Sequence, residues 1–192
     1  MLTNKRTFLF LTGIFIITSF SSCLKERKFP VPTSAPTGTL VINEFMAYEH
    51  NDYGDNLGTG AGSDWMELYN GTDTAITFGA NQWYVSDTIG APNKFLLPAT
   101  IFGNPIVLPS HQYLVIYCDG FNTTNSQIHT SFKLGHSSGD VVLYYAPTGG
   151  TARIVDKYTY GTQSYDISMG RIPNGGSSWS QCATPTPGAA NQ

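Results

Sequence analysis

The chain is poor in charged residues, in cysteine and in helical patterning. Only 12% of its 192 residues are charged, and three are cysteines. After the first 22 residues, no stretch repeats apolar residues at intervals of three and four, which argues against a helical fold. Its histidines are His50, His111, His129 and His136. None of them forms a pair at the spacing of zinc ligands, and we predict neither a zinc site nor a cofactor.

Basic side chains are especially scarce after the first thirty residues. Between Val31 and Gln192 there are five basic and twelve acidic side chains, a net charge of −7. Such a charge repels phosphate backbones, because nucleic-acid binding depends on clustered Lys and Arg. We therefore expect no nucleic-acid partner.

The first 22 residues have the layout of an export signal. Two basic residues precede an apolar run over residues 8–17, and small residues then lead to Cys23. This order is typical of a secretory signal, and the run is shorter than the roughly 20 apolar residues of a spanning helix. Ser21 and Ser22 directly before the cysteine resemble a bacterial lipobox, in which a lipid is attached to the thiol. A plain signal peptide, or a membrane helix that happens to contain a cysteine, is the alternative.

The lipobox resemblance predicts a lipoprotein with three parts. Residues 1–22 would be removed as the signal, and Cys23 would carry the lipid. Residues 23–38 contain three prolines among small polar residues and would form a semi-extended tether. Residues 39–192 suffice for one domain. We expect the protein to be anchored in the cell envelope, with the outer membrane favoured and the periplasmic or external side left open.

The predicted domain has the composition of an all-β protein. Runs of β-branched and aromatic residues alternate with Gly, Pro, Asn and Asp, which predicts a sandwich or a barrel of short strands. The expected strands are Thr39–Ala47, Asp64–Tyr69, Ala75–Phe78, Trp83–Ser86, Lys94–Leu97, Tyr113–Cys118, Asp140–Tyr145, Arg153–Tyr160 and Ile167–Arg171.

One of these runs shows which side of a strand meets the core. In Tyr113–Cys118, strict alternation places Leu114, Ile116 and Cys118 on the core face. Because the run is apolar throughout, we expect the opposite face to be partly covered as well. Farther along, Pro147–Gly150 predicts a hairpin turn between two strands.

Two cysteines remain once Cys23 is lipidated. Cys118 and Cys182 are an even pair in a compartment that permits disulfides. A disulfide between them would stabilise the fold by about 2–4 kcal/mol. Two buried free thiols are the other alternative, because cysteine packs well as a small apolar residue. The sequence does not fix the distance between them and leaves both alternatives open.

The glycine-rich loop around residues 48–63 is the most suggestive charged segment. Asp52, Asp55, Asn56 and Asp64 could supply oxygen ligands to a hard cation such as Ca²⁺. Their spacing does not follow an EF-hand, and a solvated, mobile loop without a metal is the default interpretation. Since function concentrates on loops held by rigid scaffolds, the loop is also where we first expect a binding surface.

No group of residues predicts catalysis. Gly135–Gly139 matches Gly-x-Ser-x-Gly, but a strand is expected to follow it and no histidine comes after it, so it does not fit a hydrolase nucleophile elbow. Asp64 and Glu67 would point to opposite faces of a strand. Buried carboxylates need hydrogen-bond partners, and we expect Glu67 and its counterpart Glu44 to be structural. The prediction is that the chain is not an enzyme.

Segments along the whole mature part resemble a lamin tail domain, from about Thr39 to Asn191. The last of them resembles the Thr-Pro-Gly ending of bacterial members. In order, the segments are Leu40–Glu44, Asp64–Asn70, Trp83–Asp87, Tyr113–Tyr117, Ser131–Gly135, Gly139–Leu143 and Thr184–Asn191. The resemblance implies an immunoglobulin-like β-sandwich.

The resemblance also implies a role in binding. Bacterial members are commonly extracytoplasmic, and many are attached to surface enzymes. We therefore expect a lipid-anchored envelope protein that binds or scaffolds, and whose loops meet an envelope protein or a glycan. One alternative is an accessory subunit of a separately encoded surface enzyme. Another is a polysaccharide-binding module, which would need exposed aromatic side chains clustered on one face.

Overall fold

The described structure covers most of the predicted domain. The residues that the computed structural model describes are 39–51, 53–55, 62–79 and 82–192. They all belong to the second of two units into which the chain divides, residues 32–192. The predicted signal, tether and lipidated Cys23 lie outside the described residues. The part that is described contains strands but no α-helix, and thus no helix of the length and apolarity needed to cross a membrane.

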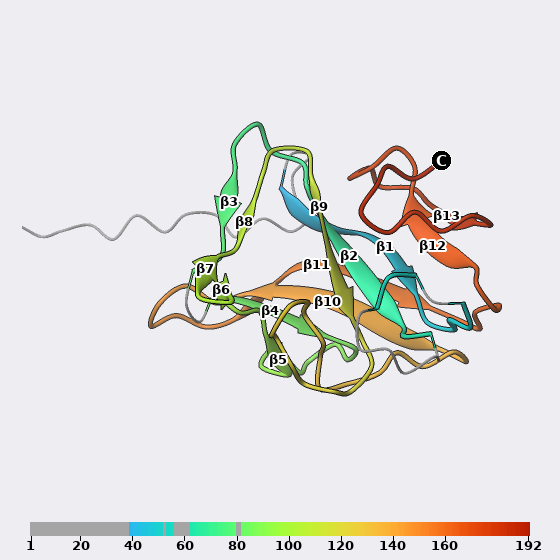
Figure 1. Ribbon diagram of the computed structural model, residues 1–192, viewed down its shortest axis with the longest axis horizontal. Helices are drawn as coiled ribbons and strands as arrows, with labels where there is room; N and C mark the ends of the chain where they lie inside the picture. Colours follow the sequence, from blue (N-terminus) through green and yellow to red (C-terminus); the bar gives the residue numbers. More distant parts are fainter. Residues whose placement is uncertain (1–38, 52, 56–61, 80–81) are drawn as a thin grey trace, which may run out of the picture. The chain divides into compact units, whose positions relative to one another are not determined.

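The larger sheet has five antiparallel strands in the order β13-β12-β1-β2-β9 (Figure 1). Their bounds are Leu40–Met46 for β1, Trp65–Asn70 for β2, Tyr113–Tyr117 for β9, Ser168–Arg171 for β12 and Trp179–Cys182 for β13. β1 is the central strand and is buried along its whole length.

The second sheet has four strands in the order β11-β10-β4-β5. Their bounds are Trp83–Ser86 for β4, Phe95–Leu96 for β5, Gly139–Tyr145 for β10 and Arg153–Tyr160 for β11. Two short ribbons complete the fold: β3 (Ile76–Thr77) pairs with β8 (Val107–Leu108), and β6 (Thr100–Ile101) pairs with β7 (Asn104–Pro105). The predicted turn joins β10 to β11, and the Gly150 N–H donates to the Pro147 carbonyl at 2.7 Å.

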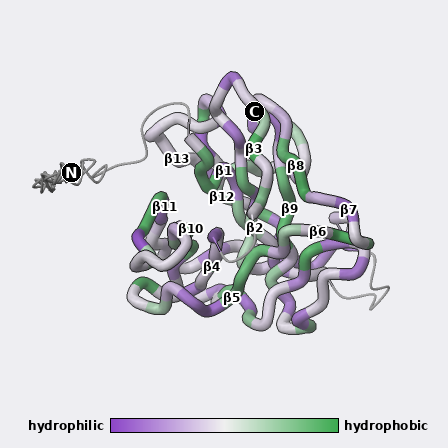
Figure 2. Tube along the Cα trace, turned by 90° about the vertical axis from the view of Figure 1, so that its left-hand side faces the viewer, coloured by the Kyte–Doolittle hydropathy of each residue, from purple (hydrophilic) through white to green (hydrophobic). Residues whose placement is uncertain are grey.

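The two sheets share one apolar core. β1 lies against β10 and β11 of the other sheet, and buried residues from both sheets form a single cluster. Within it the Phe45 ring lies 4.7 Å from that of Tyr160. Apolar stretches are visible along β8 and β9 in Figure 2. Burial of this apolar surface is the main force that holds the sheets together.

Strand β9 confirms the predicted alternation of faces. Ile116 and Cys118 are fully buried in the shared core, and Leu114 packs against it. On the other face Tyr117 packs with Trp65 in a second, smaller cluster. This second cluster partly covers the face of β9 opposite the core, as the continuous apolar run predicted.

The two cysteines of the described part are free and buried. Cys118 follows β9 and Cys182 ends β13, and these strands are the two opposite edges of the larger sheet. With neighbouring strands about 4.8 Å apart, the pair is too far apart for a disulfide. Burial raises the pKa of both thiols, which disfavours the reactive thiolate. The structure therefore contains two buried free thiols and no disulfide between them.

Two buried carboxylates face each other across β1 and β2. Glu44 and Glu67 are partners in the pairing register, next to a bulge at Asn43. Glu67 accepts hydrogen bonds from Asn43 Nδ2 at 3.1 Å and from the Gly188 N–H at 2.6 Å. Glu44 accepts hydrogen bonds from the Ser168 hydroxyl and from the hydroxyl of Thr186, the latter at 2.9 Å. This confirms the structural role expected for both acids.

The buried carboxyl of Glu67 makes stability depend on pH. Burial, followed by the nearby Glu44, raises the pKa of Glu67 from 4.5 to about 8. The folded chain therefore holds a proton that the unfolded chain has already released, so stability falls as pH rises toward 8 and is then constant. We expect the free energy of unfolding to drop by about 1–2 kcal/mol between about pH 6.5 and 8.5.

Urea unfolding at the two pH values measures this drop. Burial also raises the pKa of Asp64, to about 6, so its effect is largely complete below this window. Glu67→Gln removes the titrating group and should flatten the pH dependence, even though the new amide reduces stability at every pH. Equal slopes in the two proteins would contradict the assignment.

Candidate functional site

Three loops meet at one end of the sandwich. Antiparallel pairing brings the end of β1, the start of β2 and the end of β9 to the same edge of the larger sheet. The connections here are residues 47–64, 118–138 and 161–167. The Asp166 N–H donates to the Tyr48 carbonyl at 3.0 Å and so joins the third loop to the first. We call this region the loop end.

Asp166 fixes the beginning of the first loop. Its Oδ1 accepts the N–H groups of His50 at 2.8 Å and Asn51 at 3.0 Å, and its Oδ2 accepts the Asn51 amide at 2.7 Å. The Tyr53 N–H donates to the carboxylate of Glu49 at 2.9 Å. The default expectation was a mobile, solvated loop, and these bonds restrain its described part.

An exposed set of aromatic rings lies at the loop end. Tyr48 stacks on Tyr165, with ring centroids 3.7 Å apart, and on His136 at 4.7 Å. The His50 ring meets Tyr165 edge-on at 5.9 Å. Tyr165 is 58% exposed. We call these four residues the aromatic group. Rings held in this way present flat, partly apolar surfaces with polar edges, which suit a protein or sugar partner.

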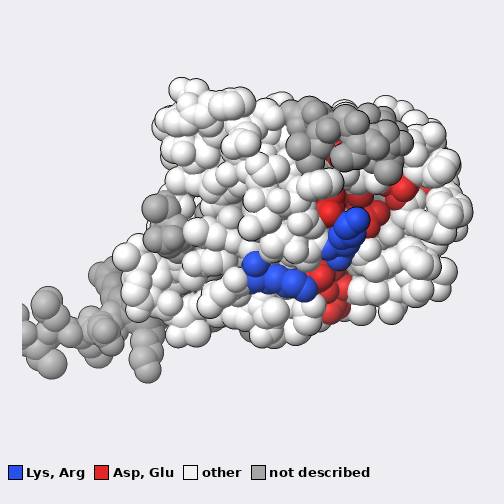
Figure 3. All heavy atoms as spheres, turned by 60° about the horizontal axis from the view of Figure 1, so that its bottom comes forward, with Lys and Arg blue, Asp and Glu red and all other residues white. Residues whose placement is uncertain are grey.

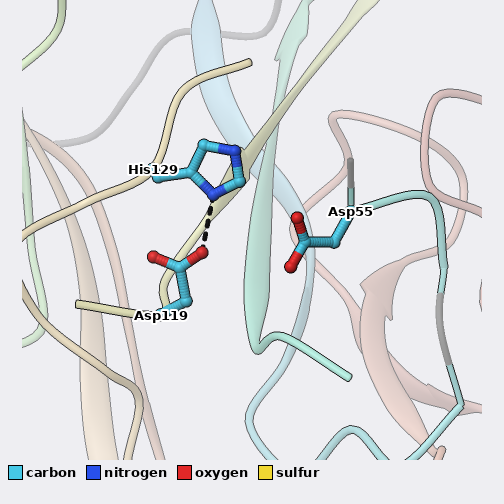
Figure 4. A group of neighbouring side chains, drawn as sticks. All are labelled: Asp55, Asp119 and His129. Atoms are coloured by element: carbon cyan, nitrogen blue, oxygen red, sulfur yellow. Dashed lines mark hydrogen bonds and ion pairs between the residues drawn. The ribbon is translucent and has the colours of Figure 1, made fainter. Parts of the chain in front are cut away.

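A second set of side chains gathers beneath the loops. Asp55, Asp119 and His129 each place one ligand-type atom within 4.8 Å of the others. Figure 4 shows the Asp55 carboxylate turned toward the pair formed by the other two. The Nδ1 atom of His129 lies 2.6 Å from Oδ2 of Asp119, and the Ser63 hydroxyl donates to Oδ2 of Asp55 at 2.5 Å. We call Asp55, Asp119 and His129 the carboxylate–histidine group.

The chain fold brings these residues together from separate segments. Asp119 comes just after β9, and its Oδ1 accepts the Phe121 N–H at 3.0 Å. The loop then returns to β9, where the Thr130 N–H donates to the Tyr117 carbonyl at 2.8 Å. The Tyr117 ring stacks on the imidazole, with centroids 5.2 Å apart. The Phe121 N–H therefore orients the acid, and ring stacking on Tyr117 orients the histidine.

A small cavity adjoins this group. It has a volume of about 290 Å³, close to the lower limit for small-molecule sites. Its lining residues are Gly62, Ser63, Asp64, Cys118, Asp119, Phe121 and Lys133. Burial raises the pKa of Asp64 to about 6. Asp119 belongs to both the cavity and the carboxylate–histidine group, so the cavity offers access to that group.

The predicted calcium ligands are not gathered as one set in the described structure. Asp52 and Asn56 lie outside the described residues. Asp64 accepts the Glu49 N–H at 3.4 Å and does not belong to the carboxylate–histidine group. Asp55 joins that group instead, with two residues that the sequence analysis did not name as ligands. The sequence did contain a signal for Asp119, because this acid directly follows the predicted strand Tyr113–Cys118.

Charged side chains are few on the face shown in Figure 3. Basic and acidic atoms there adjoin one another, and most of the face carries neither sign. Among the described residues, Lys94 forms an ion pair with Asp87. Where opposite charges are adjacent, their fields largely cancel at a distance.

The two facing antiparallel sheets define an immunoglobulin-like β-sandwich, as the sequence predicted. The family model described as Lamin Tail Domain matches residues 33–162. The chain therefore belongs to the lamin tail domain family, which is non-catalytic. The match ends before β12, so the last two strands of the larger sheet and the closing tail extend beyond it. No curated protein and no solved structure matches the chain.

Proposed function

We propose that this chain is a lipid-anchored protein of the cell envelope that binds a protein or a glycan through its loop end and does not act as an enzyme. Its membership of a non-catalytic, immunoglobulin-like family supports a role in binding or scaffolding. The layout of residues 1–22 and the small residues before Cys23 support the anchor. Two acyl chains on that cysteine would make the attachment stable, whereas one would leave it reversible.

The aromatic group is the observation that carries the proposed binding role. Tyrosine is enriched among residues that dominate binding energy, because it offers a large contact area with few rotatable bonds. Here the rings already stack on one another, and Asp166 holds the backbone on which His50 lies. A surface that is ordered before binding loses less conformational entropy when a partner arrives.

The glycan alternative depends on the same observation. A polysaccharide-binding module needs exposed aromatic side chains clustered on one face, and the aromatic group is such a cluster. Other exposed apolar residues of the described part do not belong to the aromatic group. Phe102, for example, is 73% exposed on the turn between β6 and β7. A probe at the loop end, compared with a probe at this turn, tests which surface meets the partner.

Photocrosslinking on intact cells tests the proposal. A photoreactive phenylalanine analogue is placed at Tyr165, with a matched probe at Phe102, and the products are analysed by mass spectrometry. We expect one dominant protein or glycan adduct from Tyr165 that is absent from Phe102. Cys23→Ala should move the protein out of the membrane fraction and remove an adduct that depends on anchoring.

The outcomes separate the parts of the proposal. A protein adduct favours a scaffold or an accessory subunit, whereas a sugar adduct favours the glycan-binding module. Identical adducts from both probes would contradict a binding role for the loop end. Membrane retention of the Cys23→Ala variant would contradict the lipid anchor.

A further inference from the structure

The carboxylate–histidine group has the chemistry of a metal site. Asp55, Asp119 and His129 are 8%, 6% and 1% exposed, so all three are buried. Their ligand-type atoms lie within 4.8 Å of one another. Two carboxylates and one imidazole are a donor set that divalent transition ions favour. We propose that the three residues bind one divalent transition ion, of which Zn²⁺ and Mn²⁺ are the representative cases.

Charge balance supports an ion at this position. Buried like charges repel each other, and ionised carboxylates that leave water must be paired. The Ser63 hydroxyl and the Phe121 N–H each donate to one of the two acids, but both donors are neutral. Lys133 lines the adjoining cavity together with Asp119, and its single positive charge matches only one of the two carboxylates. A divalent cation would offset both.

The imidazole of His129 supplies the nitrogen of the donor set. Its Nδ1 contacts Asp119, whereas its Nε2 is buried without any hydrogen-bond partner. Buried polar atoms normally have a partner, so the protein groups alone do not satisfy this ring. Figure 4 shows one ring nitrogen directed at the Asp119 carboxylate, and the Asp55 carboxylate turned toward this pair.

The donor set also indicates which ions the site would prefer. Calcium takes six to eight oxygen ligands, and an imidazole nitrogen is a poor substitute for one of them. Zinc and manganese accept carboxylate and imidazole together. The adjoining cavity, which Asp119 also lines, could supply water as a further ligand. The site would therefore prefer Zn²⁺ or Mn²⁺ to the Ca²⁺ that the loop sequence suggested.

An ion here would fasten the loop end. Asp55 belongs to the loop that follows β1, whereas Asp119 and His129 belong to the segment after β9. The protein already links the two segments through the Gln127 amide, which donates to the Gly54 carbonyl at 2.7 Å. Metal binding would add a stronger link between them. This inference goes beyond the proposed function, because the aromatic group could bind a partner with or without the ion.

Metal titration of the full chain tests the site. The chain, without a polyhistidine tag and in detergent, is first stripped with a chelator. It is then titrated by calorimetry with Zn²⁺, Mn²⁺ and Ca²⁺, and thermal unfolding is followed in parallel. We expect one Zn²⁺ or Mn²⁺ per chain, at least tenfold tighter than Ca²⁺. The midpoint of unfolding should rise with ion concentration, as linkage requires.

Matched variants show whether the ion is held by these residues. Asp55→Asn and His129→Asn should each weaken binding at least tenfold. His111→Asn is the control, because His111 also contacts an acid, at 3.2 Å from Asp73, but in an exposed pair. Asparagine tolerates the positive φ of 56° at this position, and binding should be unchanged.

The proposal remains testable if a buried variant fails to fold. Asp55→Asn preserves the shape of a loop residue, and visible absorption of Co²⁺ added to the unaltered chain reports on ligand geometry directly. An absence of stoichiometric binding would overturn the proposal. So would binding that survives Asp55→Asn, or a preference for Ca²⁺.

Discussion

Replacing Arg171 with alanine is expected to lower the free energy of unfolding by about 3–5 kcal/mol. The guanidinium is 8% exposed. Its Nη2 lies 2.9 Å from both carboxylate oxygens of Asp156, and its Nε donates to the Ile42 carbonyl at 2.7 Å. Arg171 belongs to the larger sheet and Asp156 to the smaller one. The variant would leave a buried carboxylate without its cation at the place where the two sheets meet.

Equilibrium unfolding in urea measures this loss. Arg153→Ala is the control. Arg171 lies over the Trp179 ring at 4.6 Å and Arg153 over the Tyr145 ring at 5.4 Å, but Arg153 is exposed. We expect the control to change stability by less than about 1 kcal/mol. Removing both charges, as Arg171→Met with Asp156→Asn, should recover much of the loss. A loss below about 1 kcal/mol for Arg171→Ala would show that the pair contributes little.

Most strands of the two main sheets could be predicted because their patterns are strong. All nine predicted strands are present, including the central β1 and the hairpin of β10 and β11. These strands combine β-branched and aromatic residues with clear turn residues at their ends, so that local preference and burial agree. Their order in the sheets was not predicted, because pairing between distant strands depends on packing that no local pattern records.

The four strands that were missed have weak local patterns. β6, β7 and β8 have two residues each, and β7 contains Pro105, which cannot donate to a ladder. β13 follows a stretch rich in glycine and serine after Pro173. It forms because β12 offers it a partner. Tertiary pairing therefore decided what intrinsic preference could not.

The candidate site was predictable only in part. Asp55 was named because acids on a glycine-rich loop suggest a cation. His129 was passed over because no second histidine lies at ligand spacing, and Asp119 was not considered. The contact between Asp55 and Asp119 joins residues 64 positions apart, and it exists only because β2 and β9 pair. The aromatic group likewise assembles from three loops that the sheet brings to one end.

Deletion of residues 186–192 is the second large effect that we expect. This tail supplies donors to both buried acids: Thr186 Oγ1 donates to Glu44 at 2.9 Å and the Gly188 N–H to Glu67 at 2.6 Å. The Asn191 amide donates to the carbonyls of Asn43 at 3.1 Å and Arg171 at 3.0 Å. Each buried acceptor left without its donor costs about 1–3 kcal/mol. The deletion should therefore remove about 3–6 kcal/mol, a large part of the stability of a typical domain.

Two further variants separate the loss of these hydrogen bonds from simple shortening of the chain. Removal of the exposed Gln192 alone should leave unfolding by urea unchanged, whereas Asn191→Ala should reproduce part of the loss. If the buried acids cause the effect, the deletion should cost less in a Glu44→Gln, Glu67→Gln background. A deletion that left stability within about 1 kcal/mol would mean that water satisfies the two acids. The expected loss would instead show that the folding unit includes the closing tail, although the family match ends at residue 162. The two acids lie inside the matched residues, whereas their donors Ser168, Thr186 and Gly188 lie outside, so the matched part alone would leave both acids short of donors.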